Sequence, residues 1–338
     1  MSSLIVEATK VLEVKPIENA ERLELVIVKG WQCVVGKDQY HVGDLVIYVP
    51  IDAVFPQPLS DKLGITKYLH SQRVKTAKLR GTISQGVIMS ADEVPGAVEG
   101  QDVAEALGIT KYEAPAPGQC TSGTPRPQHP DFLRYTDIEN IKNYPDVLVE
   151  GEEVVMTEKI HGTNFRAANI AKEDPSMFVE GVNHAGLHVG SHRMDFVETP
   201  ENLYWKAARM YKLDEILLPG YQLFGEIYGK GVQKLTYDLE SFDVRFFDLM
   251  KDLKYVDYDD FKAFCAEHKL PVVPEVYRGP WDKHGVRMAD GQSFIAKHIR
   301  EGFVVKPAKE RWDHKVGRVV LKAISEKYLL KDFDDGGH

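Results

Sequence analysis

The sequence predicts an α+β protein of two domains, and three observations support this prediction. The chain has 338 residues, which corresponds to about two domains of ordinary size. Its hydrophobic fraction of 43% and charged fraction of 28% are those of a globular protein with buried cores. Short apolar runs separated by turn residues fill the first third, whereas strand-like and helix-like patterns mix in the remainder. The composition excludes a disordered protein, a collagen, a coiled coil and a small disulfide scaffold.

The first domain, expected over residues 1–108, has the pattern of a small all-β barrel. Its apolar runs are spaced as strands and are separated by turn residues such as Gly30, Gly36 and Gly43. The predicted strands cover residues 4–14, 23–28, 31–35, 45–51 and 86–90. The opening of the chain, around residues 14–23, resembles OB folds, which are barrels that commonly bind nucleic acid. This resemblance implies an OB-like nucleic-acid-binding domain.

A proline-rich segment separates the two domains. Five prolines lie among Gly, Ser, Thr and Gln between residues 115 and 130, so we expect a linker over 109–131 and a second domain over 132–338. Thr136 and Glu139 have the spacing of a capping box, which predicts a short helix that ends before Pro145.

The second domain is expected to contain antiparallel sheets flanked by helices. Its strands and helices do not alternate regularly, which argues against a doubly wound parallel sheet. Strands are predicted at 154–159, 165–170, 222–228, 245–249, 302–306 and 318–324, and helices at 200–217 and 256–268. The hexapeptide Leu-Gly-Ile-Thr-Lys-Tyr occurs at 63–68 and again at 107–112, and each copy is predicted to end a helix with a left-handed glycine.

Charge, cysteines and hydropathy limit the class of protein. The net charge of −9 argues against a protein that coats nucleic acid, because phosphate contacts need Lys and Arg. A nucleic-acid site must therefore be a local patch.

Cys33, Cys120 and Cys265 are too few and too scattered for a disulfide framework or a zinc site. No apolar run approaches the roughly 20 residues that span a bilayer. We expect a soluble, cytoplasmic monomer with no membrane partner.

The segment from Glu158 to Asn164 carries the strongest chemical signal. Lys159 follows a predicted strand and precedes a turn that contains Gly162, a position from which a nucleophilic amine can face a pocket. Four more motifs follow in order, each on or beside a predicted strand. They are Phe224-Gly225-Glu226, Phe246-Phe247-Asp248, Glu301-Gly302-Phe303-Val304-Val305-Lys306 and Leu321-Lys322.

This ordered series resembles the covalent nucleotidyltransferase superfamily, which contains ATP-dependent ligases and mRNA-capping guanylyltransferases. Asn164, five residues after Lys159, and the run from Gly225 to Gln233 are similar to RNA ligases. An OB domain before the transferase domain is similar to the Deinococcus-type RNA ligases. The resemblance implies a lysyl-AMP on Lys159 and a requirement for ATP with Mg²⁺ or Mn²⁺. The implied substrates are 3′-OH/5′-phosphate breaks in nicked RNA or RNA/DNA duplexes with RNA on the 3′-OH side.

The resemblance also implies roles for individual residues. Glu226 and Glu301 are expected to hold the metal, Glu226 also near the ribose, because Mg²⁺ takes carboxylate oxygens. Lys306 and Lys322 are expected to contact phosphate and, together with a hydrated Mg²⁺, to lower the pKa of Lys159. Phe247 is expected to stack on adenine while Phe246 faces the core, because strand side chains alternate. Further nucleotide contacts are expected from Glu158, His161, Gly162, Asn164 and Arg193.

Two positions depart from the superfamily pattern. His161 stands where the superfamily usually has Asp, and the last motif has Ile324 where RNA ligases often have a second Lys. Lys306, Lys315 and Arg318 are candidates to replace that charge. The alternative functions are a GTP-using capping-type guanylyltransferase and a non-catalytic RNA-binding protein that retains the fold.

Two clusters outside the motifs need an interpretation. Arg73, Lys75, Lys78 and Arg80 form the densest basic cluster of the first domain and are predicted to contact duplex, the alternative being a solvated hairpin. The spacing of His184, His188 and His192 would suit metal ligation on a helix. Their glycine-rich context predicts a strand and a turn instead, so no metal site is expected there.

Overall fold

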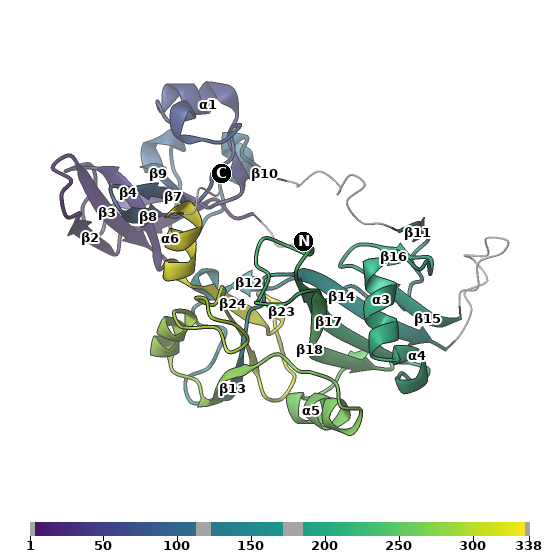
Figure 1. Ribbon diagram of the computed structural model, residues 1–338. Helices are drawn as coiled ribbons and strands as arrows, with labels where there is room; N and C mark the ends of the chain where they lie inside the picture. The colour runs from purple at the N-terminus through teal and green to yellow at the C-terminus, as the bar shows by residue number, and fades with distance from the viewer. Residues whose placement is uncertain (1–3, 113–122, 172–184, 335–338) are drawn as a thin grey trace. The chain divides into compact units, whose positions relative to one another are not determined.

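The computed structural model describes residues 4–112, 123–171 and 185–334 (Figure 1). The chain divides into two compact units, one formed by Met1–Ala116 with Leu330–His338 and the other by Pro117–Leu329. Strands outnumber helices in the described part of both units, which confirms the α+β class. The predicted linker lies partly outside the described residues, and its described ends pair with strands of each unit, Thr110–Lys111 in the first and Pro125–Arg126 in the second.

The first unit consists of small antiparallel sheets around two hydrophobic cores. In its described part the strands form two three-stranded groups, β1-β5-β9 and β2-β3-β4, and two pairs, β7-β8 and β10-β6. Alternation is clearest in β4, where Trp31, Cys33 and Val35 are buried and the residues between them are less buried. The strands are β1 (Glu7–Lys10), β2 (Glu13–Pro16), β3 (Leu23–Val28), β4 (Trp31–Gly36), β5 (Leu45–Val49), β6 (Ala53–Val54), β7 (Ala77–Leu79), β8 (Thr82–Ser84), β9 (Val87–Ser90) and β10 (Thr110–Lys111).

The repeated hexapeptide has the predicted role in both copies. Helix α1 (Gln57–Lys62) and helix α2 (Ala104–Leu107) end where the hexapeptides begin. Gly64 and Gly108 adopt left-handed φ values of 67° and 64°, a conformation that costs glycine little because it has no Cβ. The similarity therefore reflects helix termination and is confirmed at both sites.

A seven-stranded antiparallel sheet, in the order β11-β16-β15-β14-β17-β18-β19, forms one half of the second unit. Trp205, Ala207 and Ala208 of α3 pack with Phe165 and Leu223 of the sheet in one core. The elements are β11 (Pro125–Arg126), β14 (Thr163–Ile170), β15 (Gly186–Gly190), β16 (Asp195–Phe196), α3 (Leu203–Met210), α4 (Leu213–Ile216), β17 (Tyr221–Gly229), β18 (Phe242–Lys251), β19 (Lys254–Tyr255) and α5 (Tyr258–Glu267).

A five-stranded sheet, in the order β12-β24-β21-β13-β20, forms the other half. All of its pairs are antiparallel except β12 with β24. Val154, Met156, Phe303 and Val305 contribute to its core because β13 and β21 are neighbours. The elements are β12 (Glu139–Asn140), β13 (Glu153–Glu158), β20 (Glu275–Pro280), β21 (Gly302–Pro307), β22 (Trp312–Asp313), β23 (Gly317–Arg318), β24 (Leu321–Ile324) and α6 (Glu326–Asp334).

Two helix predictions were wrong in detail. The hydroxyl of Thr136 hydrogen-bonds to Tyr255 Oη at 3.2 Å instead of capping a helix, and Glu139–Asn140 pairs with β24 as a strand. Only a 3₁₀ turn follows, at Ile141–Asn143. The helix predicted over 200–217 is divided into α3 and α4, because Lys212 adopts a left-handed φ of 49°.

The structure tests two further predictions, the absence of a membrane-spanning segment and the absence of disulfides, within the residues that it describes. No helix among them is long and apolar enough to cross a membrane. Cys33 and Cys265 are buried and form no disulfide, whereas Cys120 lies outside the described residues. Burial raises the pKa of the Cys265 thiol to about 12, which makes this side chain unreactive near neutral pH.

Candidate active site

A pocket lies between the two sheets of the second unit, at the connection from β13 to β14. This connection, residues 159–162, carries Lys159 from one sheet toward the other. The pocket lining contains six predicted site residues and eight others. The six are Glu158, Lys159, Asn164, Glu226, Phe247 and Lys306; the others are Tyr135, Ile138, Val155, Thr157, Ile160, Tyr258, Val273 and Val304.

Strand register brings two of these side chains together. Asn164 on β14 lies directly opposite Glu226 on β17, so both side chains project from the same face of the sheet. Gly162 ends the connection before β14 and has no room for a side chain. A Cβ there would lie 2.2 Å from the carbonyl oxygen of Ile227 and 2.9 Å from Cγ of Glu226. The glycine therefore permits the close approach of the two strands beside Lys159.

Lys159 is held by carboxylates. Its Nζ lies 2.8 Å from Oε1 of Glu301. Burial opposes protonation of the amine, but the charges of Glu301 and Glu226 outweigh it and raise the pKa of Lys159 above its ordinary value. We expected a hydrated Mg²⁺ together with Lys306 and Lys322 to lower this pKa; with the two lysines alone it is raised instead. The reason is that the carboxylates of Glu301 and Glu226 stabilise the protonated amine.

The two carboxylates respond differently to the same pocket. Desolvation raises the pKa of Glu226 to about 8; Lys159 opposes this shift and Glu301 adds to it. Burial would also raise the pKa of Glu301, but Lys159 and His161 lower it below its usual range. Glu301 is therefore ionised near neutral pH while Glu226 retains a proton. Two adjacent carboxyl groups with hard oxygen donors fit a divalent cation that keeps several waters.

His161 occupies the position where the superfamily usually has Asp. Its backbone N–H donates to Tyr237 Oη at 2.7 Å, which fixes the turn. Its Nδ1 lies 3.5 Å from Oε2 of Glu301, and its ring centroid lies 6.3 Å from that of Tyr328. The imidazole therefore acts on Glu301, the same carboxylate that binds Lys159.

A β-bulge on β18 aims Phe247 at the pocket. Phe224 pairs with Asp248 and Gly225 pairs with Phe246, so Phe247 is an extra residue without a partner across the strand pair. Phe246 is fully buried in the core of the seven-stranded sheet, as alternation predicted. The bulge then places both Phe247 and Asp248 on the pocket side, which simple alternation would not do. The contact with Tyr135 agrees with this orientation of Phe247. Tyr135 lines the pocket, and its ring centroid lies 4.9 Å from that of Phe247.

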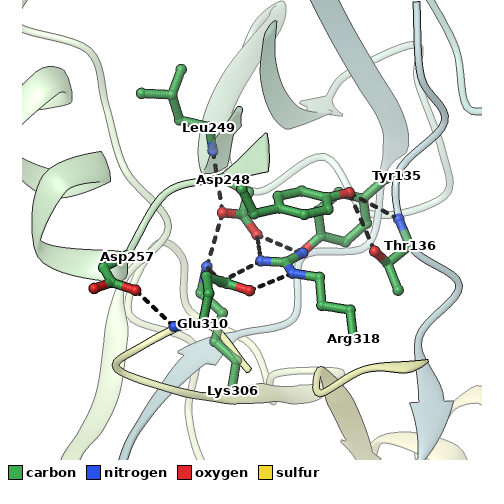
Figure 2. Close-up of polar contacts among 9 residues, drawn as sticks. Tyr135, Thr136, Asp248, Leu249, Asp257, Lys306, Glu310 and Arg318 are labelled. Atoms are coloured by element: carbon green, nitrogen blue, oxygen red, sulfur yellow. Dashed lines mark hydrogen bonds and ion pairs between the residues drawn. The ribbon is translucent and has the colours of Figure 1, made fainter. Parts of the chain in front are cut away.

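Asp248 anchors a buried polar network that the sequence did not reveal (Figure 2). Its Oδ1 accepts from Lys306 Nζ at 2.9 Å, and its Oδ2 accepts from Arg318 at 2.6 Å and from Tyr135 Oη at 2.8 Å. Glu310 binds the same two cations, with 2.7 Å between its Oε2 and Arg318 Nε. Burial would raise the pKa of Asp248, but Arg318 and Lys306 outweigh it and lower the pKa.

The sequence singled out Asp248 and Lys306 in two separate motifs, but nothing in it indicated that they belong to one network. Arg318 lies 70 residues away in the chain, so no local spacing could identify it as a partner. Its side chain is fully buried and bound by two carboxylates, so Arg318 does not supply the missing charge of the last motif to the pocket. Lys315 is exposed on the turn between β22 and β23. Of the three candidates, Lys306 alone lines the pocket.

Two buried acceptors of the pocket have no hydrogen-bond donor within the described residues. They are Oε1 of Glu158 and Oδ1 of Asn164, both on residues that line the pocket. The other carboxylate oxygen of Glu158 accepts the N–H of Phe294 at 2.8 Å. A buried acceptor without a donor is costly, so these two atoms fit a ligand that brings amino or hydroxyl groups.

Other predicted residues lie outside the lining. Lys322 on β24 is adjacent to Val304 on β21, and burial and the charge of Lys159 lower its pKa. Arg193 is exposed in the turn between β15 and β16.

The histidines at 184 and 188 form no metal site among the described residues. His188 is buried, and its Nδ1 lies 2.6 Å from Oδ2 of Asp195, while His184 lies outside the described residues. No group of three or more His, Cys, Asp and Glu in the described part of the chain could hold a metal ion.

The basic cluster of the first unit is only partly available. The guanidinium of Arg73 binds Asp52, with 2.9 Å from Nε to Oδ1, and lies 3.7 Å from the centroid of the Tyr112 ring. Lys78 is half-buried on β7, while Lys75 and Arg80 are exposed. The structure therefore leaves two exposed cations at this site and uses Arg73 within the unit.

Comparisons with known proteins address both units. A family model described as RNA ligase matches residues 152–324, and an OB-fold domain model matches residues 5–91. The structure of Naegleria gruberi RNA ligase with pyrophosphate matches with a TM-score of 0.79 and 28% identity, over 99% of this chain and 100% of that one. A lysine-to-alanine variant of that ligase with ATP and Mn matches with a TM-score of 0.80 and 27% identity, over 98% of this chain and 99% of that one. A glutamate-to-alanine variant with AMP and Mn matches with a TM-score of 0.78 and 26% identity, over 98% of this chain and 100% of that one.

Proposed function

Because the chain belongs to the RNA ligase family, we propose that it seals 3′-OH/5′-phosphate breaks with ATP through a lysyl-AMP on Lys159. The proposed substrates are nicked RNA or RNA/DNA duplexes with RNA on the 3′-OH side, bound by a monomer. The observation that carries the proposal is the placement of Lys159. Its amine lies at 2.8 Å from Glu301, beside a pocket with two buried acceptors that have no donor within the described residues.

The proposed reaction has three steps. Nζ of Lys159 attacks the α-phosphorus of ATP, the bond to the β-phosphate oxygen breaks, and pyrophosphate leaves. The 5′-phosphate of the nucleic acid then attacks the same phosphorus, which breaks the P–N bond and frees Lys159. Finally the 3′-OH attacks the activated 5′-phosphate, and AMP leaves. Each step is a phosphoryl transfer, for which positioning and electrostatic stabilisation supply most of the catalysis.

Lys159 must lose a proton before it can attack. Its ion pair with Glu301 keeps the amine protonated, so the charge of that carboxylate has to be neutralised. Glu301 and Glu226 would hold a divalent cation, Mg²⁺ or Mn²⁺. When bound, the cation supplies positive charge that balances the carboxylates and the phosphate oxygens. His161, 3.5 Å from Glu301, adds a second group that stabilises this carboxylate.

The remaining residues are proposed to bind the nucleotide. Phe247 stacks on adenine at the bulge, and Glu158 and Asn164 accept hydrogen bonds from its amino group and the ribose. Lys306 and Lys322 are proposed to contact phosphate, Lys306 after exchange of one of its carboxylate partners. The other proposed contacts are Gly162, which provides space, and Arg193, whose exposed guanidinium would bind phosphate.

The first unit is proposed to contribute duplex contacts. Lys75 and Arg80 are exposed, and Lys78 is half-buried beside them. Phosphate contacts position a duplex without reading its sequence, which suits an enzyme that acts on breaks in many sequences. Arg73 is bound to Asp52, so its proposed role is to hold this segment in place.

A labelling experiment tests the proposal. The full chain is incubated with α-labelled ATP or GTP and with Mg²⁺ or Mn²⁺. We expect label from ATP on the peptide that contains Lys159, stable to alkali but released by hot acid as a P–N bond requires, and its transfer to 5′-phosphorylated RNA. Label from GTP alone would indicate a capping-type enzyme. The absence of label from either nucleotide would leave the non-catalytic RNA-binding function.

The raised pKa of Glu226 predicts a pH dependence for metal use. Below about pH 8 the carboxyl keeps its proton, which a bound cation must displace. The apparent affinity for Mn²⁺ in self-adenylylation should therefore increase about tenfold per pH unit between pH 6.5 and 7.5 and level off above about 8.5. Glu226→Gln should abolish this dependence, and the exposed control Glu198→Gln should retain it. The same pH dependence in both variants would exclude Glu226 as the titrating ligand.

A further inference from the structure

A loop over residues 288–300, whose first two residues end the 3₁₀ helix Lys283–Ala289, carries an exposed aromatic ring next to the pocket. Phe294 is 60% exposed, although its backbone N–H donates to the carboxylate of Glu158 at 2.8 Å. On the same loop, the N–H of Lys297 donates to Oδ2 of Asp238 at 3.2 Å. The loop is therefore attached at two points, and one of them is the residue directly before Lys159.

The loop is braced from inside by a buried arginine. Arg300 is 7% exposed, and its Nη2 donates to the carbonyl oxygens of Met288 at 2.7 Å and of Asp290 at 3.3 Å. Gly291 has no room for a side chain, because a Cβ would lie 2.4 Å from that nitrogen. The Phe294 ring lies 5.5 Å from the Arg300 guanidinium carbon. The ring is thus presented to solvent by a fixed backbone, which lowers the entropy cost of binding.

The segment that contains Phe294 has more cations than carboxylates although the protein is acidic, and the residues on either side of it, Asp282 and Glu301, are acidic. Between residues 283 and 300 the chain has four Lys and Arg residues against one carboxylate, while its net charge is −9. Lys283, Arg287 and Lys297 are exposed and form no ion pair with any residue that the structure describes. Since Arg300 binds the carbonyl of Met288 and lies close to Phe294, the backbone beside Arg287 is near the aromatic ring.

We propose that this surface, formed by the 288–300 loop with Lys283 and Arg287, holds the RNA strand beside the break. Phe294 stacks on a base or ribose, and the three exposed cations bind neighbouring phosphates. An aromatic platform flanked by cations is the arrangement by which proteins hold single strands without reading sequence. A strand that reacts at Lys159 must pass close to Glu158, to which the loop is bonded. This inference rests on the proposed ligase function for its substrate.

The test measures RNA binding and self-adenylylation separately in the full chain. The probe is a fluorescent nicked duplex with RNA on the 3′-OH side. Phe294→Ala should weaken its binding roughly 5- to 100-fold, and Phe294→Trp should restore it, because stacking needs only an aromatic face. The triple change of Lys283, Arg287 and Lys297 to Ser should reduce the salt dependence of binding by about 2 to 3 in log–log slope. Sealing of pre-adenylylated RNA should fall in parallel, while label uptake from ATP persists.

Matched variants control for charge and exposure. Lys251, Lys254 and Lys269 are exposed lysines of the same unit that form no ion pair with a described residue, and their triple change to Ser removes the same charge outside the loop. Leu218→Ala removes a side chain that is 62% exposed. Both controls should bind RNA as the unaltered protein does. Unchanged RNA affinity in the loop variants would overturn the inference, as would equal loss of label uptake and RNA binding. If the unaltered protein takes no label, the ligase function fails, yet the binding measurement still decides the role of the loop.

Discussion

Replacing Lys159 by Ala is expected to reduce ATP-dependent labelling and sealing by roughly 10³-fold or more, because the amine is the proposed nucleophile of the first step. The same variant should still join RNA that carries a 5′-adenylate, since the last step uses the 3′-OH as nucleophile. The measurement compares single-turnover sealing of 5′-phosphate RNA with that of pre-adenylylated RNA. Equal loss with both substrates would contradict a role limited to nucleotide transfer.

Lys159→Arg separates the nucleophile from the ion pair. A guanidinium keeps the positive charge beside Glu301 but remains protonated, so it cannot attack phosphorus. We expect the Arg variant to fail in self-labelling as completely as Lys159→Ala. It should retain more of the joining of pre-adenylylated RNA, because Glu301 keeps a cation. Substantial label on the Arg variant would place the nucleophile elsewhere.

Replacing Arg318 by Met is expected to destabilise the second unit by about 3–5 kcal/mol. The guanidinium is fully buried and binds both Asp248 and Glu310, so its removal leaves two buried carboxylates with Lys306 as their remaining cation (Figure 2). Removing one partner of a buried ion pair costs more than the pair contributes, because the uncompensated charge remains desolvated. Urea unfolding followed by tryptophan fluorescence measures the change.

Arg209→Met is the matched control for that experiment. Arg209 also binds two carboxylates, those of Glu198 and Asp214, but its side chain is 44% exposed. Exposed ion pairs contribute about 0–1 kcal/mol, so this variant should unfold almost as the unaltered protein does. If the two substitutions lower stability equally, the buried network is not a major source of stability.

The strands that carry the motifs could be predicted from sequence because their apolar runs are long and continuous. The runs at 154–159 and 222–228 correspond to β13 and β17. The helix predicted to begin at Thr136 is wrong, and the sequence alone could not show this. Its capping box is a local pattern, and it lost to a hydrogen bond with Tyr255, 119 residues away. The OB-like first domain and the RNA-ligase resemblance are confirmed by the family models.

The candidate site was predictable only where motif order identified residues. Lys159, Glu226 and Phe247 were singled out in this way and lie in one pocket. Alternation alone would have placed Asp248 in the core beside Phe246, and the bulge at Phe247 was not visible in the sequence. The loop around Phe294 was missed because its importance comes from one backbone hydrogen bond to Glu158.

The ion pair of Lys159 also has a consequence for chemical selectivity. An ammonium ion does not add to carbonyl compounds, isocyanates or activated esters, whereas a free amine in a pocket would react with all of them. The ion pair with Glu301 therefore disfavours acylation and carbamylation of Lys159, because it stabilises the protonated amine further. In the proposed reaction, the amine becomes reactive only when the groups that neutralise this carboxylate arrive together with the nucleotide. The proposed substrate would then itself activate the nucleophile that attacks it.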